Sequence, residues 1–228
     1  MTSKANGLKR LLGLLICLCA MVFGSGSAKA QPSTPKLDDI IAGVEKRYSG
    51  SGFFARFSQT STLKEMDISD SASGSIHVKH PGMMRWEYEK PDRQIFITDS
   101  RTLWIYRPED NQVMVGEAPA YFGSGKGASF LSDMKQLRKN FILLRHEQAE
   151  TDLSYVLTLT PKIQKVEVSV IYLSISKTTY DVVQIVTLNS YGDETRINFH
   201  DLRFNQGYDN NFFEFKIPAG IDVLRLDQ

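Results

Sequence analysis

Cysteine is almost absent from this chain of 228 residues, and its two cysteines, Cys17 and Cys19, lie in the most apolar stretch, residues 11–24. Basic side chains precede that stretch, and small residues follow it as far as the A-x-A sequence Ala28-Lys29-Ala30. This order is typical of a secretory signal peptide. We therefore predict that residues 1–30 are cleaved, which leaves a mature chain that must fold without disulfides.

A long apolar run is also lacking. The stretch over residues 11–24 is shorter than the roughly 20 residues that a membrane-spanning helix needs, so a retained anchor is the less favoured alternative. A lipid-modified cysteine would follow a small residue, whereas Cys17 follows Ile16 and Cys19 follows Leu18. We expect an exported, soluble product.

The mature chain has no excess of positive charge. The full chain has 27 basic and 26 acidic residues, and residues 1–30 hold four of the basic and none of the acidic ones. The mature chain therefore has 23 basic against 26 acidic residues, a net charge of −3. Nucleic-acid binding needs a dense basic face, so nucleic acid is not expected as a partner.

Motifs of catalysis and metal binding are missing as well. The glycine-rich segment over residues 123–127 fails as a phosphate-binding loop, because Gly127 rather than Ser or Thr follows Lys126. His77 and His80 are three apart on a predicted strand and so point to opposite faces. There is no H-E-x-x-H and no G-x-S-x-G sequence. We expect no catalytic residue, metal or cofactor, and a hydrolase without a motif remains the enzyme alternative.

The sequence that is present favours β-structure. Apolar residues with helical spacing predict one helix over residues 37–48 and another over residues 130–137. Elsewhere the period is two, which predicts strands near residues 53–62, 72–79, 83–89, 94–98, 102–107, 112–116, 141–147, 153–160, 166–175, 182–188, 194–203 and 212–217. Short turns join most of them, so we expect an antiparallel meander, strongly curved and capped by helices on its concave side. Periodicity leaves open whether the enclosed space is packed core or a cavity.

Two segments carry a resemblance to a known family. Residues 80–91 (HPGMMRWEYEKP) and 97–106 (ITDSRTLWIY) resemble the most recognisable stretch of the periplasmic outer-membrane lipoprotein carrier family, LolA. Residues 53–59, 159–162 and 213–223 extend the similarity over nearly all of the mature chain. The resemblance implies a mainly β fold, an unclosed antiparallel β-barrel of about 11 strands whose apolar cavity is capped by a lid of short helices.

The resemblance also implies a site and a task. Residues 31–228 would form one carrier domain, with residues 31–36 flexible. The cavity would hold the acyl chains of lipoproteins and need no cofactor. Its expected lining residues are Phe57, Met84, Trp86 and Trp104, and the expected lid residues are Phe130, Leu131 and Met134.

Partners and localisation follow from the same resemblance. We expect a periplasmic monomer that receives lipoproteins from an inner-membrane ABC transporter of the lipoprotein-release type and passes them to the outer membrane, with an acceptor lipoprotein there as a further partner. The alternative is a lipid-sensing module of an envelope-stress regulator with a similar sheet. Such a regulator would ordinarily carry a further C-terminal domain, whereas this chain ends at Gln228.

One position departs from the family. Where the family often has an arginine that holds the lid closed, immediately before the proline of a turn, this chain has His80 before Pro81. An imidazole offers fewer hydrogen-bond donors than a guanidinium group. His80 is therefore the candidate lid latch, and the latch is expected to be weaker or pH-dependent.

Overall fold

The computed structural model describes residues 35–119, 130–163 and 167–226. The predicted signal peptide, residues 31–34 and the glycine-rich segment over residues 123–127 lie outside the described residues. The helices are α1 (Leu37–Arg47) and α3 (Lys135–Asn140), with short 3-10 helices η2 (Glu147–Ala149) and η3 (Asn210–Phe213). The strands are β1 (Gly52–Leu63), β2 (Ile68–Lys79), β3 (Met83–Lys90), β4 (Gln94–Asp99), β5 (Thr102–Arg107), β6 (Gln112–Glu117), β7 (Phe141–Arg145), β8 (Ser154–Pro161), β9 (Val170–Ser176), β10 (Val182–Leu188), β11 (Glu194–Phe204) and β12 (Asp222–Arg225).

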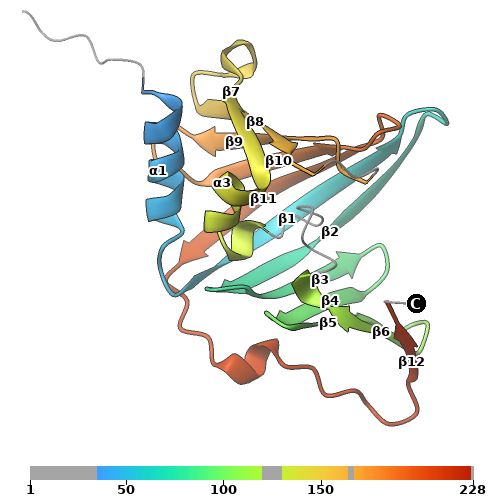
Figure 1. Cartoon of the computed structure of the whole chain (residues 1–228). Helices are drawn as coiled ribbons and strands as arrows, with labels where there is room; N and C mark the ends of the chain where they lie inside the picture. The colour runs from blue at the N-terminus through green and yellow to red at the C-terminus, as the bar shows by residue number, and fades with distance from the viewer. Residues whose placement is uncertain (1–34, 120–129, 164–166, 227–228) are drawn as a thin grey trace, which may run out of the picture. The chain divides into compact units, whose positions relative to one another are not determined.

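The twelve described strands form one open sheet in the order β12-β6-β5-β4-β3-β2-β1-β11-β10-β9-β8-β7 (Figure 1). It consists of two meanders, β1 to β6 and β7 to β11, joined by the antiparallel pairing of β1 with β11. Within the described part of the chain, all of the strand pairs are antiparallel except that of β12 with β6. The predicted fold class, a mainly β unclosed sheet with few short helices, is confirmed. The expected single meander is corrected to two.

The prediction of a strand over residues 212–217 is wrong. This segment begins in η3 and continues as extended chain, and the last strand is β12. Phe213 is fully buried, and the ring of Phe215 lies 5.0 Å from that of Tyr106 on β5. The alternation of aromatic residues thus reflects packing across one face of the sheet, because the segment crosses that face and joins no edge.

Helix α1 forms because its apolar residues fall on one side. Ile40, Ile41 and Val44 are buried, and the Asp39 carboxylate accepts a hydrogen bond of 3.0 Å from the Lys36 N–H at the start of the helix. The chain approaches closely at Gly43, where a Cβ atom would lie 2.4 Å from the Tyr180 ring. A larger residue at position 43 would require the Tyr180 ring or α1 to shift.

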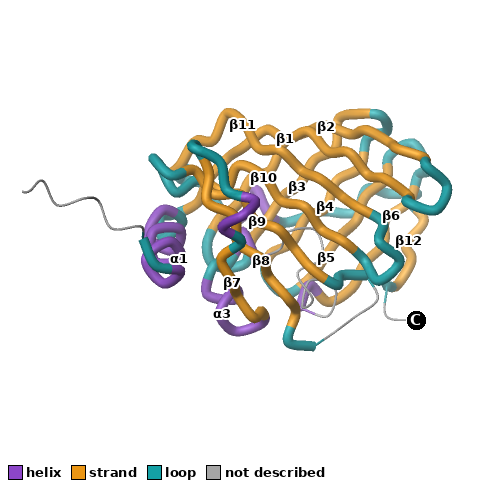
Figure 2. Tube along the Cα trace, turned by 90° about the horizontal axis from the view of Figure 1, so that it is seen from above, coloured by secondary structure: helices purple, strands orange, loops and turns teal. Residues whose placement is uncertain are grey.

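The two faces of the sheet pack against different elements. We define the inner face as the one whose buried side chains share a core with α1 and α3, and the outer face as its opposite. Figures 1 and 2 show the sheet curving around this core. On the outer face, η3 contacts β3 and β4. The curved sheet therefore encloses one apolar interior, and the C-terminal segment covers part of its back.

Candidate functional site

The centre of the inner face is a cluster of aromatic side chains from several strands. The Trp86 ring lies 5.1 Å from Phe57, 6.4 Å from Tyr88 and 6.2 Å from Phe199. Trp86 and Phe57 are buried, as is Met84 two residues earlier on β3. Three of the four predicted lining residues thus lie together in the interior.

Trp104, the fourth predicted lining residue, lies on the outer face. Trp86 pairs with Phe96 across β3 and β4, whereas Trp104 pairs with Ile97, the next residue along β4. Neighbouring residues of a strand point to opposite faces, so Trp86 and Trp104 do too. The structure therefore does not bring Trp104 to the interior. Ile105 of the same strand lies on the inner side, in a second small core with Leu103 and Ala118.

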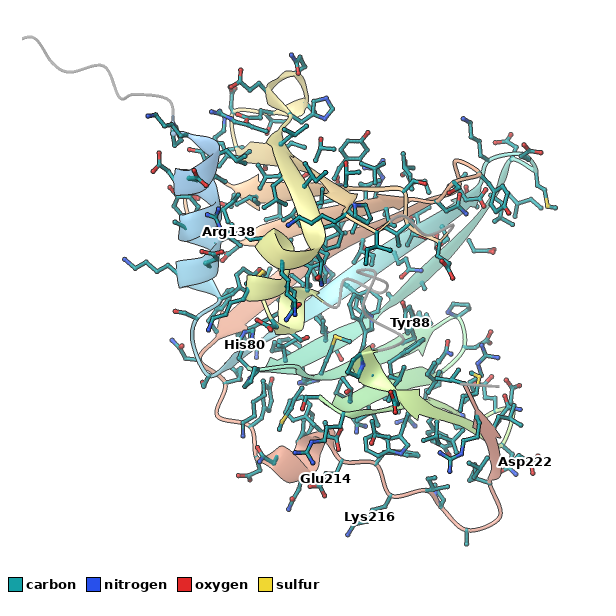
Figure 3. The ribbon with its side chains drawn as sticks, in the orientation of Figure 1. His80, Tyr88, Arg138, Glu214, Lys216 and Asp222 are labelled. Atoms are coloured by element: carbon teal, nitrogen blue, oxygen red, sulfur yellow. The ribbon has the colours of Figure 1, made fainter. Side chains whose placement is uncertain are left out.

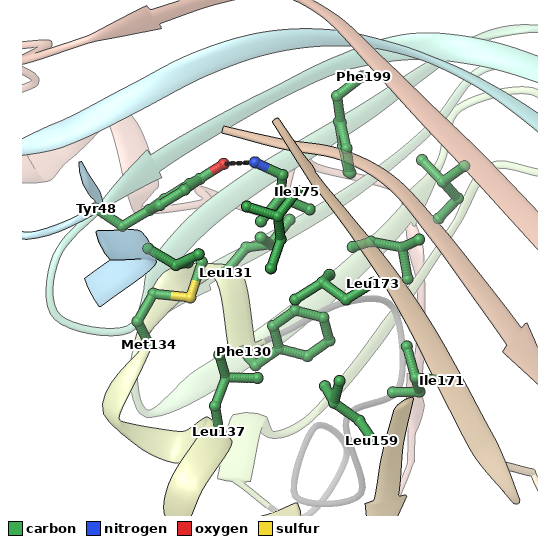
Figure 4. Close-up of a cluster of buried hydrophobic side chains, with 14 of the residues drawn as sticks. Tyr48, Phe130, Leu131, Met134, Leu137, Leu159, Ile171, Leu173, Ile175 and Phe199 are labelled. Carbon is green, nitrogen blue, oxygen red and sulfur yellow. Dashed lines mark hydrogen bonds between the residues drawn. The ribbon is translucent and has the colours of Figure 1, made fainter. Parts of the chain in front are cut away.

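The predicted lid residues are inserted into the interior. Phe130, Leu131 and Met134 are 2%, 1% and 5% exposed and belong to the same core as the inner face. Figure 4 shows them among Leu159, Ile171 and Leu173 of β8 and β9. Their own side chains therefore occupy apolar space that a bound ligand would need.

His80 connects the sheet to this segment. Its Nδ1–H donates a hydrogen bond of 2.8 Å to the carbonyl oxygen of Ser132, and the backbone N–H of Gly82 donates one of 2.9 Å to the same oxygen. Both donors come from the turn between β2 and β3. The lid residues are thus held at their midpoint by two hydrogen bonds to that turn. Figure 3 labels His80 in the turn.

A second connection joins the lid to α1. Arg138 of α3 donates hydrogen bonds of 2.9 Å to Asp38 and 3.1 Å to Glu45, both on α1. The Arg138 side chain is 45% exposed, so these ion pairs are worth little individually. Such a contact can open at low cost.

A cleft of about 670 Å³ lies where α1, the turn between β2 and β3 and α3 meet. Its apolar floor includes Tyr48 and Met134, which are both core residues. The Tyr48 hydroxyl accepts a hydrogen bond of 3.0 Å from the Val182 N–H, and burial raises the pKa of Tyr48 well above its ordinary value. Glu45, Asp133 and Arg138 give the rim a mixed charge. The cleft therefore leads from a polar rim to the apolar core beside the lid.

Polar groups also lie inside the aromatic cluster. The Tyr88 hydroxyl donates a hydrogen bond of 2.9 Å to the Gln59 side chain, whose Nε2 donates one of 3.1 Å to Ser61. The indole N–H of Trp86 is buried and has no acceptor among the described residues. Gln59, Tyr88 and Phe199 are not among the lining residues predicted from the sequence. Alternation along β1 and β3 places Gln59 with Phe57 and Tyr88 with Trp86, but the non-local pairing that adds Phe199 has no local signal.

Other kinds of site receive no support in the described part of the chain. It holds no group of three or more histidine, aspartate or glutamate side chains placed to bind a metal. Its helices include none with both the length and the apolar character to cross a bilayer.

The fold and the site define a class of proteins. Its members have an open antiparallel sheet whose apolar inner face is covered by short helices. The family model described as outer membrane lipoprotein carrier protein LolA matches residues 49–216. The chain therefore belongs to the LolA family.

Relatives support this assignment. A protein of Neisseria meningitidis serogroup B named outer-membrane lipoprotein carrier protein is 27% identical over 211 residues, which cover 92% of this chain and 94% of that protein. A protein of Chromobacterium violaceum with the same name is 31% identical over 196 residues, covering 86% and 92%. The crystal structure of an uncharacterized conserved protein from Thermus thermophilus matches with a TM-score of 0.55 at 14% identity, covering 82% of this chain and 98% of that one. This last likeness concerns the fold alone.

Proposed function

We propose that the mature chain is a periplasmic lipoprotein carrier that binds the acyl chains of its cargo against the inner face, beneath the lid. The observation that carries the proposal is the lid itself. Fully buried apolar side chains are placed there by a segment whose contacts with the rest of the chain include two hydrogen bonds to the Ser132 carbonyl and the exposed ion pairs of Arg138. The family membership and the relatives' names support the same role.

The energetics of the task fit this arrangement. Burying one methylene group is worth about 0.8 kcal/mol, so an acyl chain of roughly fifteen methylenes is held in a membrane by about 12 kcal/mol. A carrier must offer a comparably apolar surface and still release the chain. A lid that fills the site when cargo is absent serves both needs, because its side chains cover the apolar surface before loading and replace the acyl chains on release.

The route of the cargo belongs to the same proposal. The carrier receives lipoproteins released from the inner membrane by an ABC transporter and delivers them to the outer membrane, where an acceptor lipoprotein is a further partner. It acts as a monomer, and neither catalysis nor a cofactor is part of the cycle. No feature of the described residues favours the regulatory alternative.

Co-purification with cargo tests the proposal. The mature protein is isolated from cells that co-express its own lipoprotein-releasing transporter, and bound species are identified by mass spectrometry. We expect triacylated proteins with the wild type and a large loss with Phe57→Glu, which places a charge on the inner face. Tyr106→Glu on the outer face is the matched control and should retain cargo. Absence of acylated protein from the folded wild type would reject the carrier role.

A further inference from the structure

Trp86 is buried, and its indole N–H makes no hydrogen bond to any residue that the structure describes. Its side chain is 3% exposed, and its Nε1–H has no acceptor among the described residues. A buried donor without a partner costs free energy comparable to a lost hydrogen bond, so such groups are rare in folded proteins. The group therefore requires an explanation.

The neighbours of Trp86 do not supply one. Phe57 and Phe199 present aromatic carbon, and a ring face is only a weak acceptor of an N–H. The nearby Gln59 side chain is hydrogen-bonded to Tyr88 through its oxygen and to Ser61 through its Nε2, and it makes no hydrogen bond to the indole. Within the described inner face, the donor is thus present while the acceptor is not.

We propose that the Trp86 Nε1–H donates a hydrogen bond to the carbonyl oxygen of an ester-linked acyl chain of the cargo. This inference rests on the proposed function, and it adds a recognition element for the acyl linkage to a site that is otherwise apolar. An ester carbonyl is a strong acceptor at the head of a chain that is otherwise only methylene. A donor already stripped of water gains a full hydrogen bond when that oxygen arrives, because no water has to be displaced from it.

The inference explains why tryptophan suits this position. A phenyl ring would fill much of the same apolar space and leave no unpaired group. The indole ring packs against Phe57 and Tyr88 like any aromatic residue, yet it also offers one donor. Trp86 would therefore distinguish an acyl chain from an alkyl chain of equal length.

The test compares two ligands that differ in one carbonyl per chain. The probes are a synthetic dipalmitoyl-glycerylcysteinyl peptide and its dihexadecyl ether analogue, and affinities are measured by displacement of a fluorescent fatty acid. We expect the wild type to bind the ester about three- to tenfold more tightly than the ether, the range of one hydrogen bond. Trp86→Phe should bind both ligands with the affinity that the wild type shows for the ether. Phe199→Leu is the matched control, since it should weaken both ligands equally and keep the ester preference.

A second readout does not depend on the folding of a Trp86 variant. The chain has two tryptophans, so Trp104→Phe leaves Trp86 as the only tryptophan, whose emission is read by selective excitation of the indole. We expect the ester ligand to shift its emission to longer wavelength relative to the ether ligand. Equal affinities of the wild type for ester and ether, or an ester preference retained by Trp86→Phe, would overturn the inference and leave the carrier role intact. Failure of both ligands to bind would instead reject the carrier role.

Discussion

The imidazole Nδ1 of His80 lies 2.8 Å from the carbonyl oxygen of Ser132, 52 positions further along the chain. This hydrogen bond joins the turn between β2 and β3 to the segment that places Phe130 and Leu131 in the interior. Because the oxygen is a carbonyl acceptor, His80 must carry a proton on Nδ1 whenever the bond is made. His80 can therefore act at the position where the family often has an arginine, as a single-donor latch.

Removal of this latch should loosen the lid. In His80→Ala one hydrogen bond to Ser132 is lost and that of Gly82 remains. A loss of about 1 kcal/mol corresponds to an approximately fivefold larger open population. Stopped-flow binding of an environment-sensitive fatty acid should accelerate by that factor, while His200→Ala, at an exposed histidine of β11, should behave like the wild type. Equal lipoprotein release by wild type and His80→Ala at both pH 6 and pH 8 would count against the latch.

A smaller lid side chain should lower the stability of the protein and raise its affinity for acyl chains. Phe130→Ala leaves a cavity in the interior and should lower the free energy of unfolding by about 3 kcal/mol. It should also tighten acyl-chain binding, because the ligand no longer displaces a phenyl ring. Phe213→Ala is the control, since Phe213 is equally buried but belongs to η3, which packs on the outer face. Similar destabilisation without tighter binding is expected there, and tighter binding in both variants would argue against the lid.

The C-terminal segment should loosen at acidic pH through His77. Its Nδ1 lies 3.0 Å from the Tyr208 hydroxyl, and its ring packs on Phe212. Burial lowers the pKa of His77 below its ordinary 6.5, against the opposing effect of Glu87 and together with that of Arg85. The unfolded chain therefore takes up a proton first as the pH falls below 6.5, and stability declines until the folded-state pKa is passed.

Urea unfolding between about pH 8 and pH 5 measures this effect. The wild type should lose more stability over that range than His77→Gln, which cannot titrate. Hydrogen exchange should show the additional opening in residues 205–215. If the free energy of unfolding depended on pH in the same way for both proteins, His77 would have no such role.

An ion pair beside α1 should contribute strongly to stability. Arg145 donates hydrogen bonds of 2.6 and 2.9 Å to the Glu150 carboxylate and a third, of 2.7 Å, to the Pro35 carbonyl just before α1. Hydrogen bonding to Arg145 lowers the pKa of Glu150, so its contribution is complete above pH 4.5 and is lost as the pH falls through the lowered value.

Two glutamates near Arg145 allow a matched comparison. The Glu150 side chain is 9% exposed, and Glu150→Gln should cost about 3 kcal/mol at neutral pH. Glu147 lies 3.7 Å from Arg145 and is 68% exposed, so Glu147→Gln should cost less than about 0.5 kcal/mol. Chemical denaturation checks both values. Equal losses of stability in the two variants would mean that the buried pair of Arg145 and Glu150 contributes no more than an exposed ion pair.

Local pattern predicted most of the sheet. Alternating residues and short turns identified eleven of the twelve described strands, and alternation within β3 places Met84, Trp86 and Tyr88 on one side. The pairing of β1 with β11, which joins the two meanders, brings together residues more than 130 positions apart. Such a contact leaves no periodic signal, so the order of strands could not be predicted.

The site was predicted less completely, for a related reason. Alternation separates Trp104 from Ile105, but it does not say which of the two faces the core. Both faces of β5 are apolar because the C-terminal segment covers the outer one, where Phe215 contacts Tyr106. The same cover explains the wrong strand over residues 212–217. The resemblance to the family suggested Trp104 as a lining residue, whereas the sheet register places Ile105 on the inner side.

Photocrosslinking establishes which face of the sheet meets the acyl chain. Benzoylphenylalanine replaces either Phe96, on the inner face, or Tyr106, on the outer face of the neighbouring strand, in cells whose lipoproteins carry alkyne-labelled fatty acids. If the inner face binds the cargo, position 96 should give a labelled lipoprotein adduct and position 106 should give none. Labelling at position 106 alone, or equally at both positions, would contradict binding at the inner face.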